Sequence, residues 1–98
     1  MTIEKKLNGA ELTITLIGRL DTSTAPQLES ELKASLDGVK SFVLDFAGLA
    51  YLSSAGLRVL LAAQKIMNKQ GKMVLKNVNE TILEIFDVTG FIDILTIE

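Results

Sequence analysis

Apolar and polar residues alternate near the start of the chain. Within residues 10–17 every second residue is apolar, and this two-residue period is typical of a strand with one buried face. Asn8-Gly9 precedes that segment, and Asn-Gly between two extended segments is a strong hairpin signal. We therefore expect residues 2–7 to form an antiparallel strand at the edge of the sheet, and Gly18 to break the strand over 10–17.

Two later stretches have the period of an amphipathic helix. Thr24 and Pro26 suit the start of a helix, and leucines then recur every four residues up to Gly38. In residues 54–69 a broad apolar face is opposed by arginine and lysine, and Gly71 follows. The sequence therefore predicts one helix from near residue 24 to Gly38 and a second over 54–69.

The remaining segments complete a layered fold. Residues 42–46 are almost continuously apolar, as in a central strand covered on both faces, and 72–77 follow the second helix as the next strand. This strand-helix-strand unit requires a parallel pair with a right-handed crossover. Residues 79–90 predict a short third helix, and 94–97 predict a last strand. The fold class is α/β.

Composition indicates one folded domain and excludes several chemistries. The 98 residues are 48% hydrophobic and 22% charged, with no repeat, linker or low-complexity segment, so a single domain over residues 1–98 is expected. The chain has no histidine and no cysteine. It therefore cannot build a Ser-His-Asp triad, a thiol nucleophile or a Cys/His zinc site, and we expect no enzyme activity, no metal and no cofactor.

Charge and hydropathy limit the classes of partner and the cellular location that we expect. A net charge of -2 offers no basic field for a phosphate backbone, so nucleic acid is not expected as a partner. No apolar stretch approaches the roughly 20 residues of a membrane-spanning helix, and the polar start of the chain lacks the core of a signal peptide. We expect a cytoplasmic protein without membrane insertion.

One segment departs from ordinary core patterning. Residues 49–57 join the central strand to the second helix, at the strand end where α/β folds bind ligands and partners. Ser53 or Ser54 there could simply cap the helix, or could carry a phosphate, because a helix N-terminus favours an anion. Gly56 costs roughly 1 kcal/mol in a helix, which indicates close approach by a partner or by a neighbouring strand.

Three motifs in this order and spacing resemble the STAS-domain family, specifically bacterial anti-sigma factor antagonists. They lie at residues 18–25, at 44–57 and at 85–91, so the resemblance runs nearly end to end. It implies a mixed sheet of four or five strands with three or four helices. It also implies a switch, in which the unphosphorylated protein binds an anti-sigma factor that is itself a serine kinase and thereby releases the sigma factor.

The resemblance also implies site residues. Ser54 matches the family's phosphate acceptor, with Ser53 as a minor alternative, while Ser53 and Ala55 replace the family's flanking Asp and second hydroxyl. Asp21 matches a family aspartate near the acceptor, and we expect it to lie close to Ser54, although an Asx-turn that shapes entry to the first helix is equally expected. The expected partner-binding residues are Asp21, Thr22, Ser53, Ala55, Gly56 and Arg58.

The resemblance implies two partners and leaves two other functions open. The kinase would hold ATP and phosphorylate Ser54, and a separate metal-dependent serine phosphatase would reset the switch. One alternative is a constitutive STAS scaffold or subunit of a transporter or signalling assembly, in which the serines only cap the helix. The other is a nucleotide-binding STAS module, although the sequence has no glycine-rich phosphate loop with lysine.

Overall fold

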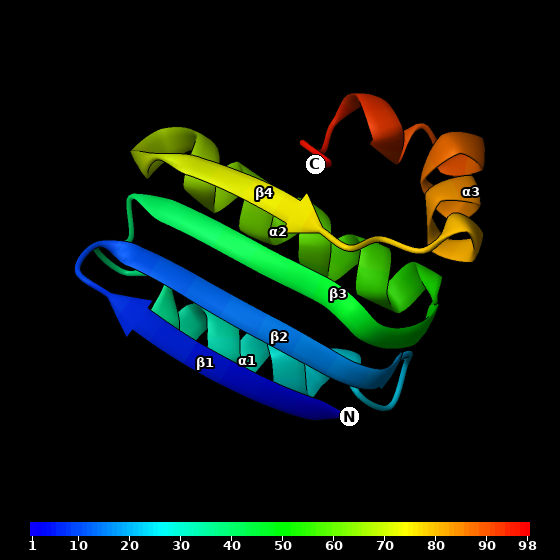
Figure 1. Cartoon of the computed structure of the whole chain (residues 1–98), viewed down its shortest axis with the longest axis horizontal. Helices are drawn as coiled ribbons and strands as arrows, with labels where there is room; N and C mark the ends of the chain where they lie inside the picture. Colours follow the sequence, from blue (N-terminus) through cyan, green and yellow to red (C-terminus); the bar gives the residue numbers. More distant parts are fainter.

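The fold is a four-stranded sheet with three helices and a short 3-10 helix (Figure 1). The computed structural model describes residues 1–98. Every helix and strand follows the order expected from the hydropathy pattern except the last. The elements are β1 (Thr2–Asn8), β2 (Glu11–Leu20), α1 (Ala25–Ser35), β3 (Ser41–Leu52), α2 (Ser54–Gln70), β4 (Lys72–Lys76), α3 (Glu80–Thr89) and the 3-10 helix η1 (Phe91–Asp93).

The strands lie in the order β1-β2-β3-β4. β1 is antiparallel to β2, and β2, β3 and β4 are parallel, which confirms the expected mixed sheet with an antiparallel edge strand. The hairpin turn is one residue later than the Asn-Gly signal indicates, because Asn8 already pairs with Glu11 and the loop is Gly9-Ala10. Gly9 has φ +63°, a conformation that glycine adopts without steric cost.

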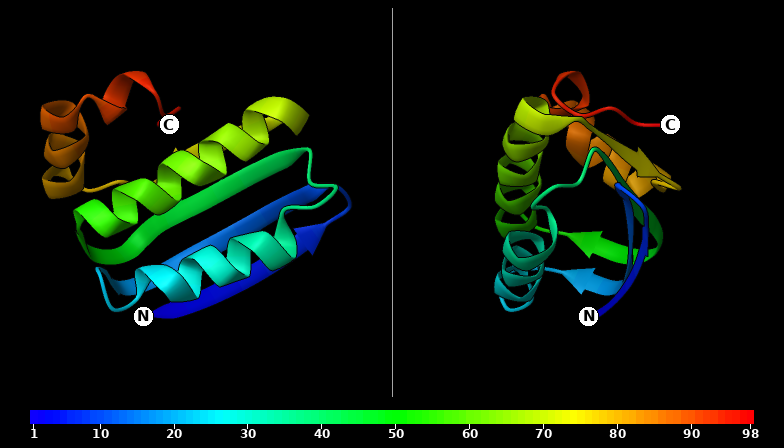
Figure 2. Two further views of the ribbon diagram at one scale, coloured as in Figure 1. Left: turned by 180° about the vertical axis from the view of Figure 1, so that it is seen from behind. Right: turned by 90° about the vertical axis from the view of Figure 1, so that its left-hand side faces the viewer.

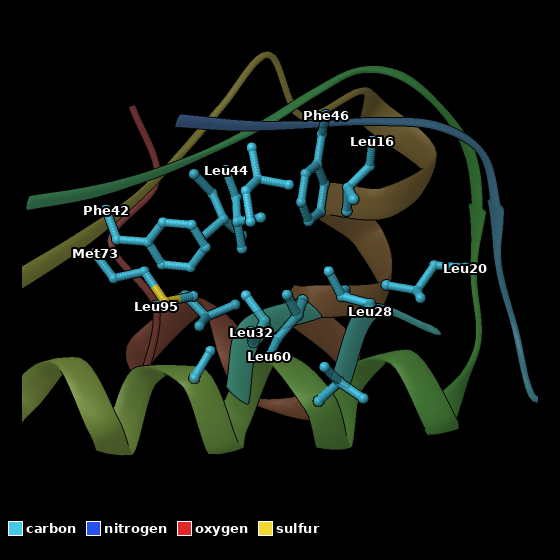
Figure 3. Close-up of a cluster of buried hydrophobic side chains, with 14 of the residues drawn as sticks. Leu16, Leu20, Leu28, Leu32, Phe42, Leu44, Phe46, Leu60, Met73 and Leu95 are labelled. Atoms are coloured by element: carbon cyan, nitrogen blue, oxygen red, sulfur yellow. The ribbon is translucent and has the colours of Figure 1, made fainter. Parts of the chain in front are cut away.

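Helices α1 and α2 lie on the same face of the sheet (Figure 2). The alternation in β2 and β3 directs their buried residues toward these helices, and the leucine stripe of α1 and the broad apolar face of α2 complete the core. Figure 3 shows leucines from several elements around Phe42 and Phe46. The largest fully buried side chains are Phe42, Phe46, Phe86, Ile14, Leu16, Leu20, Leu28, Leu44, Leu49, Leu60, Met67 and Met73.

Two strands are longer than expected. Gly18 does not break β2, because its φ of +110° accommodates an irregularity in the pairing with β3, and the strand continues to Leu20. β3 extends well beyond residue 46, to Leu52, since its second half pairs with the second half of β2. The segment over 49–57 is therefore the end of a strand followed directly by a helix, and not an open loop.

The expected last strand over 94–97 is wrong. Gly90 ends α3 in the left-handed conformation with φ +81°, and Phe91–Asp93 then form a 3-10 turn. Ile97 forms only an isolated parallel bridge to Leu75 at the outer edge of β4, where the Leu75 amide donates to the carbonyl of Thr96 and the Leu75 carbonyl accepts from the amide of Glu98, each at 2.9 Å. Residues 94–97 have the composition of a strand, but the 3-10 turn leaves only the end of this segment beside β4, as a single bridge.

Candidate functional site

The carboxyl ends of β2 and β3 meet beside the start of α2. Leu20 and Leu52 are register partners, and the amide of Ser53 donates a hydrogen bond of 2.9 Å to the carbonyl of Leu20. The loop that begins at Asp21 and the helix that begins at Ser54 therefore emerge side by side from neighbouring strands. The parallel pairing thus brings together two of the three sequence motifs.

The two serines at this edge differ in exposure. Ser54 is the first residue of α2 and is exposed, and its hydroxyl makes no hydrogen bond within the chain. Ser53 occupies the N-cap position with extended backbone, but its hydroxyl makes no capping bond, and its Oγ is buried without a hydrogen-bond partner. Neither serine therefore caps α2 through its side chain, which removes the simpler of the two interpretations, whereas Asn79 caps α3 in that way.

Ala55 and Gly56 are buried in the first turn of α2. A Cβ built on Gly56 would lie 2.5 Å from Leu52 Cδ1 and 2.8 Å from Leu20 Cγ. The helix therefore approaches the ends of β2 and β3 so closely that any residue larger than glycine would push the side chains of Leu52 and Leu20 aside. Packing against neighbouring strands accounts for Gly56, and its position leaves no side chain for a partner to contact.

Asp21 organises the loop between β2 and α1. Its Oδ1 accepts hydrogen bonds from the Ser23 hydroxyl at 2.7 Å, the Ser23 amide at 3.0 Å and the Thr24 amide at 3.2 Å. The bond from the Ser23 hydroxyl is the main cause that lowers the pKa of Asp21, and the backbone and Thr24 bonds add to it. The expected Asx-turn is present, and Asp21 directly follows Leu20, whose carbonyl accepts from the Ser53 amide, but the Asp21 carboxylate makes no hydrogen bond to Ser54.

Thr22 and Arg58 line a groove between α1 and α2. The groove has a volume of about 420 Å³ and is lined mainly by small apolar side chains. Arg58 lies one turn after Ser54 in α2, is exposed, and takes part in none of the ion pairs of the structure. The remaining lining residues are Ala25, Pro26, Glu29, Leu32, Lys33, Ala55, Val59, Ala62, Ala63 and Ile66.

A stacked pair beside the site was not found from the sequence. The guanidinium of Arg19 lies 4.3 Å from the centre of the Tyr51 ring, and its Nε lies 3.7 Å from Asp21 Oδ2. Arg19 and Tyr51 are register partners in β2 and β3. Nothing in the sequence fixes which residues of two parallel strands stand opposite each other, so only the position of Arg19 in the first motif could have indicated it.

The third motif has a structural role in this fold. Phe86 of α3 is fully buried, and its ring centre lies 6.4 Å from that of Phe46 in β3. The side chain of Asn79 accepts from the amide of Ile82 at 2.9 Å and donates to the carbonyl of Leu49 at 3.1 Å. These contacts attach α3 to the end of β3 and support the strand that leads to Ser54.

The Ser54 hydroxyl at this edge could receive a transferred group. No group of three or more acidic, histidine or cysteine side chains lies close enough together to hold a metal ion, and no helix is long and apolar enough to cross a membrane. No side chain forms a hydrogen bond with the Ser54 hydroxyl, so the chain has no base in position to take its proton. An exposed hydroxyl of this kind can enter the active site of another protein and receive a group there.

This chain is similar in sequence to a known protein family and to individual known proteins. A family model described as STAS domain matches residues 2–98. BtrV of Bordetella bronchiseptica, a candidate anti-sigma factor antagonist, is 40% identical over 94 residues, which cover 94% of this chain and 80% of that protein. The anti-sigma-B factor antagonist of Bacillus subtilis is 28% identical over 98 residues, which cover 99% of this chain and 90% of that protein.

Solved structures share the fold. A crystal structure of an anti-sigma factor antagonist from Mycobacterium paratuberculosis matches with a TM-score of 0.88 at 22% identity, over 98% of this chain and 83% of that chain. SpoIIAA of Bacillus, solved in its phosphorylated form, matches with a TM-score of 0.77 at 18% identity, over 99% of this chain and 91% of that chain.

Proposed function

Because the chain belongs to the STAS-domain family, we propose that it is an anti-sigma factor antagonist controlled by phosphorylation of Ser54. In its unphosphorylated form it binds an anti-sigma factor that is also a serine kinase, and this binding releases the sigma factor in the cytoplasm. The observation that carries the proposal is the exposed, unbonded hydroxyl of Ser54 at the start of α2, beside the Asp21 loop. The names of similar proteins support the same function.

The chain is a substrate and a binding protein in this scheme, and not an enzyme. The kinase holds ATP, and its γ-phosphoryl group moves to Ser54 Oγ as the bond to the leaving ADP oxygen breaks. The proton of the hydroxyl passes to a base of the kinase. A separate serine phosphatase hydrolyses the phosphoserine with water, which returns the hydroxyl and releases inorganic phosphate.

The exposure of the two serines supports Ser54 over Ser53 as the acceptor. A kinase must reach the oxygen it phosphorylates, and Ser53 Oγ is buried while Ser54 is exposed. Asp21 is engaged by Ser23 and Thr24, so it acts on Ser54 by fixing the neighbouring loop and by its charge. Its position beside Ser53 is consistent with contact to the same partner.

The phosphate changes binding without moving the fold. It adds about -1.5 to -2 charges, which the amides at the start of α2 stabilise locally. The same charge pressed into a protein interface meets desolvation and repulsion from any carboxylate of the partner. A penalty of about 3 kcal/mol weakens binding roughly a hundredfold.

Phosphorylation is tested directly with the purified serine-kinase anti-sigma factors encoded in the same genome. Each is incubated with the chain and ATP, and the product is mapped by mass spectrometry. We expect one phosphate on Ser54, none in Ser54→Ala and undiminished labelling in Ser53→Ala. Label that persists in Ser54→Ala contradicts the assignment.

Binding is measured with the same proteins by calorimetry. Ser54→Ala should bind like the wild type, and Ser54→Asp should bind far more weakly. Equal binding of both variants, unaffected by ATP, would favour a constitutive scaffold. ATP binding by the chain alone would favour a nucleotide-binding module.

A further inference from the structure

We propose that the groove between α1 and α2 receives an apolar side chain of the anti-sigma factor, whose neighbouring carboxylate pairs with Arg58 until phosphoserine 54 takes that arginine instead. This inference rests on the proposed function. It adds the chemistry of the contact and the means by which phosphorylation breaks it.

The groove is a concave surface lined mainly by apolar side chains. Ala25, Ala55, Ala62 and Ala63 bring only methyl groups to the space between the two helices, which leaves the volume of about 420 Å³. This lies within the range of about 300–1,000 Å³ found for ligand pockets. Interfaces commonly place one apolar anchor in such a hollow, where water is excluded.

The groove is continuous with the proposed partner surface. Thr22 and Arg58 line it where β2 and β3 end, and Ala55 follows Ser54 directly. A protein that covers Ser54 therefore also covers this mouth of the groove. From there the groove runs along α1 and α2 to Ile66, which is 38% exposed.

The charges around the groove favour an acidic group in the partner. Lys33 on the α1 side is already paired with Glu29 at 3.0 Å, whereas Arg58 on the α2 side has no carboxylate within ion-pair distance. A guanidinium binds a carboxylate through two parallel hydrogen bonds. The occupant is therefore an apolar side chain next to an aspartate or glutamate.

Phosphorylation competes for the same guanidinium. Ser54 and Arg58 are four residues apart in α2, and side chains with this spacing are neighbours on one helix face. A phosphate on Ser54 lies within reach of Arg58 and presents strong acceptors to it. The arginine then pairs within its own helix, and the partner's carboxylate loses its counter-ion and faces the phosphate.

The groove is tested with variants at its rim, using the anti-sigma factor that binds the wild type. Ala62→Phe fills the groove from an exposed position and should weaken binding at least tenfold, as should Ile66→Glu, which places a charge there. Ala34→Phe, on an exposed part of α1 outside the groove, is the matched control and should bind within twofold of the wild type. Circular dichroism confirms that each variant is folded.

The outcomes separate the two proposals. If no anti-sigma factor binds the wild type, the proposed function fails. If one binds the wild type and both groove variants equally, the groove proposal fails while the proposed function stands. A dimer of the free chain that dissociates in Ala62→Phe would assign the groove to a second copy and overturn the proposal.

The role of Arg58 is tested without a partner. Phosphoserine is incorporated at position 54, and the phosphate is titrated by phosphorus NMR in the wild type, in Arg58→Gln and in Lys65→Gln. Pairing stabilises the dianion, so the phosphate pKa should be higher in Arg58→Gln than in the other two proteins. An equal phosphate pKa in all three overturns the competition for Arg58.

Discussion

Replacing Gly56 with alanine tests whether the start of α2 is held against the strand ends by close packing. The added Cβ would lie 2.5 Å from Leu52 Cδ1, 2.8 Å from Leu20 Cγ and 3.0 Å from Leu20 Cδ2. Carbon atoms in good contact are about 3.5–4.0 Å apart, so Leu52 must retreat by about 1 Å. Leu20 and Leu52 are 0% and 2% exposed, so each must move against other buried side chains.

Two opposing effects determine the size of the change. Overpacking a well-filled core costs about 1–3 kcal/mol, and alanine recovers up to about 1 kcal/mol of helix propensity relative to glycine. The recovery is smaller at Gly56 because this residue lies in the first turn. We therefore expect the free energy of unfolding to fall by about 1–2 kcal/mol, which lowers the Tm by roughly 5–15 °C in a domain of this size.

Urea denaturation measures this change. An unaltered m-value would show that unfolding exposes the same amount of surface in the variant as in the wild type. The control is to make Gly56→Ala in a Leu52→Ala variant as well. Leu52→Ala removes the atom nearest to the added Cβ, so Gly56→Ala should cost much less there than in the wild type. The two changes are then non-additive, as expected for side chains in contact. If Gly56→Ala is as stable as the wild type, or costs the same in both backgrounds, the packing explanation is refuted.

Three other substitutions test the contacts around the site. Asn79→Ala should lower the free energy of unfolding by about 1–2 kcal/mol, because it removes the α3 cap and the bond to Leu49, whereas Asn79→Asp keeps the cap and should cost less in urea denaturation. Phe86→Ala should cost about 3–5 kcal/mol by the same assay, since it empties the space beside Phe46; a cost below 1 kcal/mol would contradict this. The lowered pKa of Asp21 means that its hydrogen bonds stabilise the fold above about pH 4 and lose that effect as the pH falls through the folded-state pKa, so the stability difference between wild type and Asp21→Asn should shrink from pH 6 to pH 3. A difference that is constant over this range would contradict the link to ionisation.

The hydropathy pattern determined most of the fold because burial of one face dictates its period. The alternation over 10–17, the leucine stripe of α1 and the broad apolar face of α2 each require a covering layer on one side. Gly9 and Gly90 then mark turns that need positive φ, and these lie close to the expected positions. One α/β domain with a mixed sheet follows from these local requirements.

The ends of elements depended on pairing that no local pattern contains. β2 and β3 continue past the expected positions because each supplies hydrogen bonds to the other. Residues 94–97 have the composition of a strand, but the turn at Phe91–Asp93 leaves only a single bridge, Ile97 to Leu75, at the edge of β4. A strand exists only where a neighbouring strand meets it, and that is a property of the assembled fold.

The same division holds at the site. Local features of the sequence singled out the two serines at a helix start, and the resemblance to the STAS-domain family selected Ser54 and Asp21. Only the tertiary structure decided that Gly56 serves packing, that Arg19 stacks on Tyr51, and that a groove runs from Arg58 between two helices. These features depend on the register of parallel strands and the separation of α1 and α2, which are set by contacts between residues far apart in the sequence.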